Sequence, residues 1–254
     1  MKLPVVKSGT GPSSETVWRQ FTDLILDHAL AAGVEVPTKV GRLVVGDTPL
    51  TRRIAGVAVV TADRPAGAFD ELAKECDDLE VTLPQVLSAT ALPGSANVIF
   101  RETTGRLFRL TAAPPTPAPP PGVLVLPVRA GVAAYQRACA ERFVDECDAV
   151  SLPRHLDDPQ YDAAVVVRDG VLLGIAGLRI RGQSGLICDV WVCPHERRRG
   201  LARLLVGRMI DLAARAQLAT VYAAATDDAS TTLLEGVGFV SVATFRQYLP
   251  DTPS

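Results

Sequence analysis

The sequence predicts a mixed α/β (α+β) fold in two parts. Short strand-like runs alternate with amphipathic helical stretches along the whole chain. The segment AAPPTPAPPPG, residues 112–122, is rich in proline, which can neither complete a sheet ladder nor continue a helix interior. With 48% hydrophobic and 21% charged residues, the 254-residue chain has the composition of a globular protein. We expect a smaller mixed α/β domain at 1–111, a linker at 112–122 and a second domain at 123–254.

The first part begins with a predicted helix. Apolar residues recur at helical spacing from about residue 14 to 32, and Gly33 can close the helix. His28 on its apolar face is interpreted as a structural histidine. Strand-like runs then flank a helix at 66–76, and the runs lie at 42–46, 54–60, 79–83, 97–100 and 106–110. None of these stretches carries a chemical motif, so the sequence assigns this part no activity.

The second part has a longer series of elements. A strand at 123–128 and a helix at about 132–148 come first, and residues 163–180 read as two strands joined by the Arg168-Asp169-Gly170 turn. Later elements follow in chain order: a turn at 182–185, a strand at 186–192, a helix at 201–217, a strand at 220–225, a short helix at 229–235, and a last strand or strand pair at 238–249. This order of strands and helices predicts one compact α/β unit.

Charge and cysteine content exclude several classes of protein. The formal net charge of -2 gives no support for a general nucleic-acid or membrane-surface role, so an anion site must be local. The five cysteines are odd in number and form no C-x-x-C pair, so we expect neither a disulfide framework nor a metal site. No apolar run is long enough to span a bilayer. A reducing, cytoplasmic location fits these features.

One local cluster of positive charge stands out. The strand at 186–192 is followed by Pro194, by Arg197-Arg198-Arg199, and by Gly200 at the start of a helix. Unpaired amides and the dipole at a helix N-terminus attract anions, and the arginines add charge around them. Because Gly200 and Ala202 are small, a phosphate could approach the backbone closely. The loop is therefore predicted to bind a diphosphate.

This loop resembles the acyl-CoA signature of the GNAT N-acetyltransferases. Arg197-x-x-Gly200-x-Ala202 matches the R/Q-x-x-G-x-G/A pattern, Val192-x-Pro194 precedes it, and Gly238-Phe239 matches the late Gly-Phe. The order of elements over about 123–250 is also similar to that family. The P-loop and dinucleotide-binding glycine patterns are both absent. The first part is compatible with a degenerate second copy that lacks the signature.

The resemblance implies where acetyl-CoA would bind. Its diphosphate is expected on the loop amides, and its pantetheine arm along the edge of the preceding strand. Asp227 occupies the place of an asparagine that often contacts the pantetheine, and Ser230 offers a hydroxyl nearby. The predicted acetyl-CoA-binding residues are Val190, Trp191, Val192, Arg197, Arg198, Arg199, Gly200, Leu201, Ala202, Asp227 and Ser230.

The catalytic groups are less defined by the sequence. Asp189, three residues before Val192, is the candidate proton acceptor or ammonium anchor, with pairing to an arginine as the alternative. The family often has a tyrosine four residues before the glycine of the Gly-Phe pair, but here that residue is Leu234. Tyr222, Tyr248 or water would then protonate the leaving thiolate.

Two functions from different classes follow. The first is an acetyl-CoA-dependent N-acetyltransferase that acts on a primary amine of a small molecule or peptide, without nucleic acid or membrane partners. The second is a non-catalytic acyl-CoA-binding or sensing protein, favoured by Leu234 and Asp227. A homodimer paired through the last strand stays open.

Overall fold

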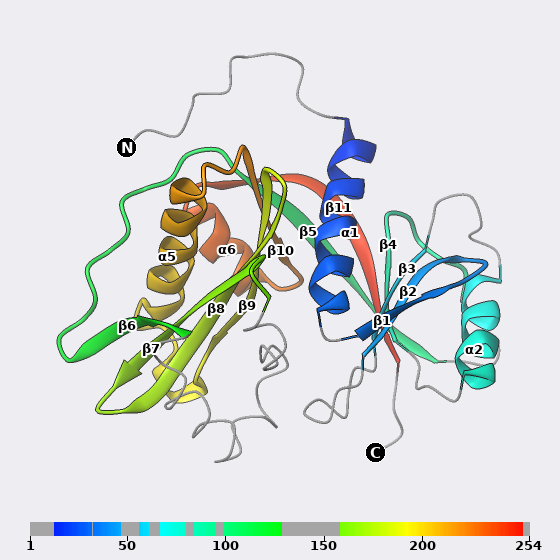
Figure 1. Cartoon of the computed structure of the whole chain (residues 1–254), viewed down its shortest axis with the longest axis horizontal. Helices are drawn as coiled ribbons and strands as arrows, with labels where there is room; N and C mark the ends of the chain where they lie inside the picture. The colour runs from blue at the N-terminus through cyan, green and yellow to red at the C-terminus, as the bar shows by residue number, and fades with distance from the viewer. Residues whose placement is uncertain are drawn as a thin grey trace.

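The computed structural model describes residues 13–31, 33–46, 56–60, 67–79, 84–94, 99–128 and 158–250. Its strands form one 11-stranded sheet in the order β1-β2-β3-β4-β11-β5-β10-β9-β8-β7-β6 (Figure 1). Most neighbours are antiparallel, whereas β3–β4 and β9–β10 are parallel. The mixed α/β class predicted from the sequence is confirmed.

The elements of the first part surround a long helix. This helix, α1 (Ser14–Leu30), is capped by Ser13, whose hydroxyl accepts a hydrogen bond from the amide of Thr16. The strands and the second helix follow in chain order: β1 (Gly33–Pro37), β2 (Gly41–Gly46), β3 (Gly56–Val60), α2 (Ala68–Asp78), β4 (Gln85–Ser88) and β5 (Phe100–Leu110). Two apolar faces of this part are buried, one under α1 and one under α2.

The elements of the second part begin after the proline-rich segment. They are β6 (Val123–Pro127), β7 (Tyr161–Arg168), β8 (Val171–Arg181), β9 (Ser184–Val192), a 3-10 turn (Pro194–Glu196), α5 (Leu201–Arg215), β10 (Thr220–Ala225), α6 (Asp228–Gly236) and β11 (Phe239–Pro250). The apolar side of α5 packs on the sheet through Leu201, Leu205 and Met209. On the opposite face, α1 packs near Leu186 and Tyr222.

The two parts share strands across the middle of the sheet. The strand β5 comes from the first part of the chain but lies between β10 and β11 of the second part. In turn, β11 pairs with β4, so each part completes the sheet of the other. The division into two domains at 112–122 remains a prediction, and any such domains would share one continuous hydrogen-bonded sheet.

Two predicted turns are confirmed. Asp169 and Gly170, with φ of 52° and 77°, join β7 to β8 and adopt the paired positive φ that a two-residue hairpin turn requires. Gly182, with φ of 56°, lies in the turn between β8 and β9. In each turn, glycine or aspartate occupies the left-handed conformation that larger side chains avoid.

Several predicted boundaries need correction. The runs at 97–100 and 106–110 were expected as separate strands, but Phe100–Leu110 is one strand because it pairs along its length with β11. The strand β1 was missed, since Gly33 was interpreted only as a helix stop. The run at 79–83 is not a described strand: Leu79 caps α2, 80–83 lie outside the described residues, and β4 begins at Gln85. The helix expected at 132–148 also falls outside them.

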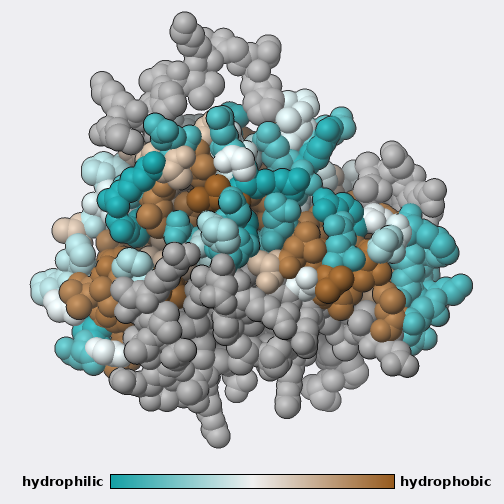
Figure 2. Space-filling view, viewed as in Figure 1, coloured by the Kyte–Doolittle hydropathy of each residue, from teal (hydrophilic) through white to brown (hydrophobic). Residues whose placement is uncertain are grey.

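The proline-rich segment is packed against the second part. Thr116 donates a hydrogen bond to Asp211 of α5 over 2.9 Å, and its methyl group lies over Gly207. At its start, the amides of Thr111 and Ala112 both donate to the carbonyl of Gly238. Hydrophobic and hydrophilic side chains are interspersed on the face drawn in Figure 2. Among the helices described, none is long and apolar enough to cross a bilayer.

Candidate functional site

The strands β9 and β10 separate part way along their length. Their parallel pairing runs from Ser184 opposite Thr220 to Ile187 opposite Ala223 and then ends. The remainder of β9, residues 188–192, has no β10 partner among the described residues. On that side β9 is no longer part of the ladder with β10, so this stretch lies at a break in the sheet, where a ligand could add to the strand edge.

A bulge in β9 marks the point of separation. Opposite β8, Cys188 pairs with Gly177 and Trp191 with Ile175, so Asp189 and Val190 face the single residue Ala176. Asp189 has a φ of 54°, which is uncommon for a residue other than glycine. Such a bulge re-aims side chains that would otherwise alternate between the two faces of the sheet.

The arginine loop leads from β9 into the N-terminus of α5. Gly200 caps α5 with φ of 80°, and a Cβ placed there would meet no atom within 4 Å. The amides of residues 198–203 have no hydrogen-bond acceptor in the part of the chain that the structure describes. A 15-residue helix with open space beside its first amides can receive an anion there.

The three arginines of this loop have different surroundings. The Nε of Arg197 donates to the carbonyl oxygen of Val192 over 3.1 Å, which holds the loop against the end of β9. Arg199 forms an ion pair with Glu196 at 3.2 Å, and Glu196 also contacts Arg168. Arg198 is exposed and has a φ of 64°. The loop geometry is therefore fixed by side-chain contacts around an exposed turn.

Asp189 lies at the centre of a polar cluster between the two halves of the chain. Its Oδ2 accepts a 2.7 Å hydrogen bond from the hydroxyl of Tyr161 on β7, and it lies 3.3 Å from Nε2 of His28 on α1. The side chains of Asp189 and His28 are only 12% and 17% exposed. The rings of His28 and Tyr161 are 5.4 Å apart. The alternative that Asp189 pairs with an arginine stays a prediction.

Cys188 joins the same cluster. The thiol donates to Oδ2 of Asp189 over 3.6 Å, and burial, reinforced by the adjacent carboxylate, raises the pKa of Cys188 well above its usual value. The thiol is therefore a donor and not a thiolate nucleophile at neutral pH. His28, Cys188 and Asp189 hold ligand atoms within 4.8 Å of one another, which would also suit a metal ion.

The two candidate tyrosines lie apart from each other. Tyr222 is fully buried under α1, and its hydroxyl donates to Gln20 over 2.6 Å. Tyr248 lies in the cluster beneath α2, where its hydroxyl accepts from the amide of Leu92 over 2.8 Å. Burial raises the pKa of both phenols. Because β5 and β10 stand between β11 and β9, Tyr248 is at least three strand spacings, about 14 Å, from β9.

The remaining predicted contacts lie around the opening. Val190 is exposed, whereas Trp191 and Val192 are buried on opposite faces of the sheet. Asp227 caps α6 and accepts hydrogen bonds from both the amide and the hydroxyl of Ser230. These two residues therefore stabilise the start of α6. Of the predicted set, the structure brings Asp189, Val190–Val192 and the 197–202 loop to one strand end.

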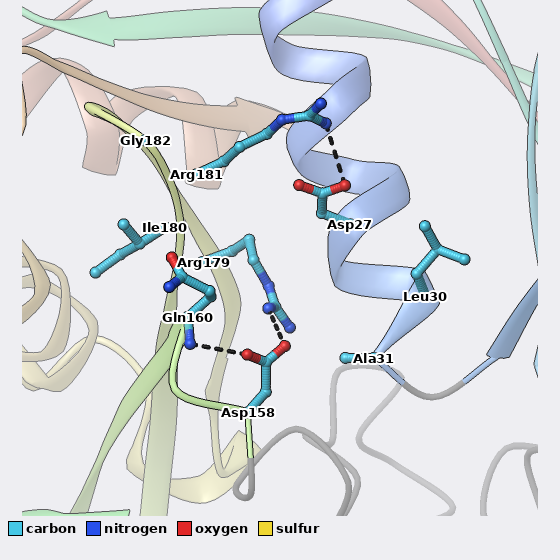
Figure 3. Close-up of a pocket in the computed structure, with 9 residues that line it drawn as sticks. All are labelled: Asp27, Leu30, Ala31, Asp158, Gln160, Arg179, Ile180, Arg181 and Gly182. Atoms are coloured by element: carbon cyan, nitrogen blue, oxygen red, sulfur yellow. Dashed lines mark hydrogen bonds and ion pairs between the residues drawn. The ribbon is translucent and has the colours of Figure 1, made fainter.

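A pocket next to this cluster was not predicted. It has a volume of about 550 Å³ and lies between the end of α1 and β8 (Figure 3). Arg179 and Arg181 of β8 line it, together with Asp27 of α1 and Asp158. His28 and Tyr161 were also missed as site residues, because their contacts with Asp189 join positions far apart in the sequence. The one sequence signal was His28, a polar residue on the apolar face of the predicted first helix, and the sequence did not indicate which residue it contacts.

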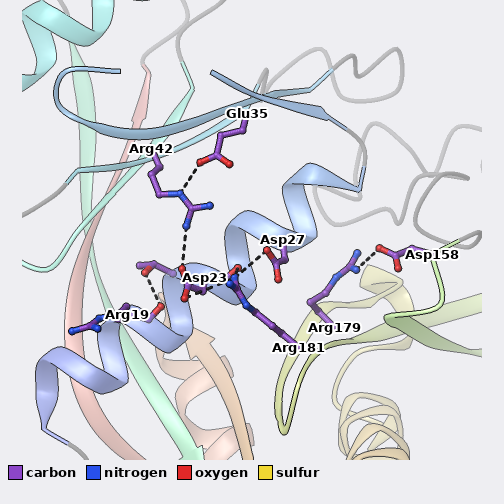
Figure 4. Close-up of polar contacts among 9 residues, drawn as sticks. Arg19, Asp23, Asp27, Glu35, Arg42, Asp158, Arg179 and Arg181 are labelled. Carbon is purple, nitrogen blue, oxygen red and sulfur yellow. Dashed lines mark hydrogen bonds and ion pairs between the residues drawn. The ribbon is translucent and has the colours of Figure 1, made fainter. Parts of the chain in front are cut away.

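Ion pairs attach α1 to the strands on both of its sides (Figure 4). Arg181 of β8 contacts Asp27 at 3.1 Å, while Arg42 of β2 contacts Asp23 at 3.0 Å. Through these contacts and its buried face, α1 is held in the position that brings His28 to β9. The site therefore combines groups from both parts of the chain.

Comparison with known proteins identifies the second part. Residues 130–239 match the model of the acetyltransferase (GNAT) family. A GCN5-related N-acetyltransferase from Kribbella flavida has a similar fold, with a TM-score of 0.61 and 16% identity over 92% of this chain and 95% of that one. A GCN5-related N-acetyltransferase-like protein from Streptococcus suis gives 0.59 and 13% over 94% and 100%.

A GCN5-related N-acetyltransferase from Sphaerobacter thermophilus gives a TM-score of 0.53 and 17% identity over 96% of this chain and 87% of that one. A search of curated protein sequences found no match. The likeness to these structures extends over both parts of the chain and concerns the fold. Residues 130–239 therefore match the acetyltransferase (GNAT) family, and the chain shares the fold of these solved structures.

Proposed function

We propose that this protein transfers an acetyl group from acetyl-CoA to a primary amine by direct attack on the thioester. The observation that carries the proposal is the separation of β9 from β10 directly beside the open N-terminus of α5. The α5 amides and the arginine loop suit the diphosphate, and the end of β9 at Val190–Val192, beyond its pairing with β10, suits the amide groups of the pantetheine arm. Asp189 lies at the end of the paired region, where this path would present the thioester.

The proposed reaction uses Asp189 as the proton acceptor. The carboxylate takes a proton from the ammonium form of the acceptor, and the neutral nitrogen then attacks the thioester carbonyl carbon. A C–N bond forms while the C–S bond breaks. The nitrogen, which becomes cationic on attack, gives its second proton to water, and the departing thiolate takes a proton from water. The hydroxyl of Tyr161 and the imidazole of His28 hold the carboxylate in place. Positioning of the two reactants supplies much of the acceleration.

Of the other catalytic candidates, neither tyrosine has the surroundings of a proton donor to a thiolate at this point. Tyr222 donates to Gln20 and helps to dock α1, whereas Tyr248 belongs to the core beneath α2. Leu234 of α6 is buried in the apolar cluster formed by α5 and the sheet, and its side chain has no ionisable group that could donate a proton. Solvent is therefore proposed as the proton source, since a thiolate with a pKa near that of free thiols can be released at neutral pH.

Acetyl-CoA binding is tested first with a matched pair of variants at Gly200. Asparagine and aspartate both tolerate the left-handed conformation and have nearly the same size, but only aspartate adds a negative charge beside the α5 amides. Isothermal titration should show that the wild type binds acetyl-CoA and that Gly200→Asn binds it somewhat more weakly. The loss of affinity in Gly200→Asp should be at least ten times the loss in Gly200→Asn. Equal effects of the two variants would argue against an anion site.

Catalysis is tested with Asp189→Asn. This change keeps the shape of the side chain but removes the proton acceptor, so CoA release with a panel of amines should fall about 100-fold or more while acetyl-CoA affinity is retained. Acetyl-CoA binding without CoA release from any amine by the wild type would instead favour the non-catalytic acyl-CoA-binding function. The buried Leu234, in place of a tyrosine, is the observation that keeps this second function in view.

A further inference from the structure

Arg179 of β8 is a buried cation that uses only part of its hydrogen-bonding capacity. The residue is 2% exposed, and Nη1 donates to Oδ2 of Asp158. Its guanidinium carbon lies 5.4 Å from the centre of the Tyr161 ring. The Nε and Nη2 atoms are buried and have no hydrogen-bond partner within the described part of the chain. A charged group that is withdrawn from water with two unsatisfied donors is unfavourable unless something else satisfies them.

The two unsatisfied atoms form a defined binding edge. In a guanidinium group, Nε–H and the adjacent Nη2–H point in the same direction and together match the two oxygens of a carboxylate. Asp158 does not use this edge, because it is bound at Nη1 and its other oxygen accepts from the amide of Gln160 over 2.8 Å. The free edge of Arg179 therefore suits one further carboxylate.

The pocket provides the space for a ligand with both signs of charge. Its volume of about 550 Å³ is in the usual range for small-molecule sites, and Arg179 lines it opposite the end of α1 (Figure 3). Among the described residues that line the pocket, the charged side chains form two pairs, Arg179 with Asp158 and Arg181 with Asp27. A ligand that carries one carboxylate and one ammonium group would leave that balance unchanged.

Tyr161 connects this edge with the proposed proton acceptor. The face of its ring lies beside the guanidinium of Arg179, and its hydroxyl donates to Asp189. A carboxylate bound at Arg179 and an amine at Asp189 would therefore be separated by about the length of the Tyr161 side chain. The separation by one tyrosine side chain favours an amine and a carboxylate several bonds apart.

Resting on the function proposed above, we propose that the acetyl acceptor is an amine that also carries a carboxylate. The carboxylate binds side-on to Nε and Nη2 of Arg179, and the amine loses its proton to Asp189. This assignment gives the pocket between α1 and β8 the role of the acceptor site. It also makes β8 the element that selects the acceptor.

The test uses pairs of acceptors that differ only at the carboxylate. Glycine, 4-aminobutanoate and 6-aminohexanoate are each compared with the corresponding carboxamide, in acetylation by the full-length protein and in calorimetric binding to its complex with CoA. For the preferred length, kcat/KM of the acid should exceed that of the amide at least tenfold. A wild-type ratio near one, or no binding of any acid in the series, overturns the inference.

Two arginine variants locate the effect. Arg179→Lys keeps the charge beside Asp158 but loses the two parallel donors, so the acid-to-amide ratio should fall to about two or less. Arg42→Lys is the control, because Arg42 also pairs with α1, at Asp23, but does not line the pocket. Its ratio should stay at the wild-type value. Equal ratios in wild type and Arg179→Lys would contradict the assignment.

A third variant provides a test that still applies if Arg179→Lys does not fold. Asp158→Asn retains Arg179 and removes its anionic partner, so the ligand carboxylate becomes the main counter-ion and the acid should bind more tightly. Unchanged or weaker binding of the acid would contradict the proposal. Failure of acetyl-CoA to bind the wild type would overturn the transfer function itself, whereas acetyl-CoA binding with equal use of acids and amides would overturn only the acceptor class.

Discussion

At the scale of single residues, the backbone of Asp189 explains how the polar cluster forms. Neighbouring side chains in a regular strand point to opposite faces. The bulge and the φ of 54° at Asp189 bring its carboxylate and the Cys188 thiol to within 3.6 Å of each other on one side. Long-range contacts then complete the cluster, with His28 from α1 and Tyr161 from β7. One irregular residue therefore decides which groups meet.

His28 is expected to act by positioning Asp189. His28→Leu removes the contact with Oδ2, so the carboxylate can turn away, and kcat for the amine should fall roughly tenfold to a hundredfold. His28→Gln, which can place a donor near the position of Nε2, should restore part of this loss. Steady-state kinetics measure both variants, and KM for acetyl-CoA should be unchanged. A loss that appears only in KM for acetyl-CoA would place His28 elsewhere in the mechanism.

The buried cysteines give a prediction about pH. Burial raises the pKa of Cys76 from 9.0 to about 11, so at pH 8 its thiolate fraction is about 100-fold lower than in the unfolded chain. Alkylation by iodoacetamide should therefore be slow at Cys76 and Cys188 in the native protein and should increase at Cys76 as the pH rises towards 11. Peptide mass spectrometry measures the modification at each site.

Unfolding in urea at pH 8 is the control for that experiment. Both thiols should then react at the ordinary rate of a free cysteine, because the low dielectric surroundings are lost. Rapid native alkylation of Cys188 would contradict its raised pKa beside Asp189 and would reopen a role as a nucleophile.

The sequence marked the residues of the arginine loop more completely than those of the polar cluster around Asp189. Arg197, Gly200 and Ala202 lie close together in the chain, so a local pattern was sufficient to mark them. The contacts of Asp189 with His28 and Tyr161 depend on tertiary packing, which no local spacing encodes. Tertiary packing also determines the surroundings of Tyr222 and Tyr248. A tyrosine can act as a proton donor, but in the folded chain their hydroxyl groups form hydrogen bonds with Gln20 and with the amide of Leu92.

At the scale of elements, Gly238 fixes the junction between α6, β11 and the proline-rich segment. It has a φ of 91°, and a Cβ there would overlap the carbonyl oxygen of Ala112. The same glycine accepts hydrogen bonds from the amides of Thr111 and Ala112. The late Gly-Phe pair is therefore explained by the close approach of the segment that follows β5.

Replacement of Gly238 by alanine should destabilise the protein by about 2–4 kcal/mol, through the positive φ and the overlap with Ala112. Thermal denaturation followed by circular dichroism measures the change. Gly236→Ala is the matched control, because Gly236 lies in α6 and an added Cβ would come only within ordinary contact of Arg203 at 3.4 Å. Its melting temperature should be unchanged or slightly raised. An equal loss in both variants would mean that the junction does not depend on Gly238.

Element type was predicted well where periodicity and turn residues agreed. The helices α1 and α5 and the β7–β8 hairpin follow from local signals, namely the apolar spacing and the Asp169-Gly170 turn. The boundaries of β5 did not, since its first residues become a strand only through pairing with β11. The position of β5 between β10 and β11 could not be predicted from local sequence either, because it depends on pairing with two strands that are far away in the chain.

At the scale of the whole molecule, the shared strands have a consequence for stability. Unfolding of the first part would remove β5 and expose the edges of both β10 and β11, while loss of β11 would expose β4. Unpaired backbone groups at several buried edges are costly. The two parts should consequently unfold together, even though the proline-rich segment separates them in the sequence.

The two tryptophans of the chain allow this to be measured, because one lies in each part. Trp18 packs against Phe21 and Phe245 under α1, and Trp191 is buried in the cluster formed by β7, β8 and β9. Trp191→Phe leaves Trp18 as the reporter of the first part, and Trp18→Phe leaves Trp191 as the reporter of the second. Urea unfolding followed by fluorescence should give transitions with the same slope as circular dichroism measures for each variant.

The fluorescence and circular dichroism transitions are compared within the same variant, so a change in stability caused by the substitution affects both equally. For each one, the fluorescence midpoint should coincide with that from far-ultraviolet circular dichroism, which reports the whole chain. A fluorescence transition displaced from the circular dichroism transition would show that one part unfolds alone. In that case the pairing of β5 with β10 and β11 would be too weak to couple the parts, and His28 could leave Asp189 without global unfolding.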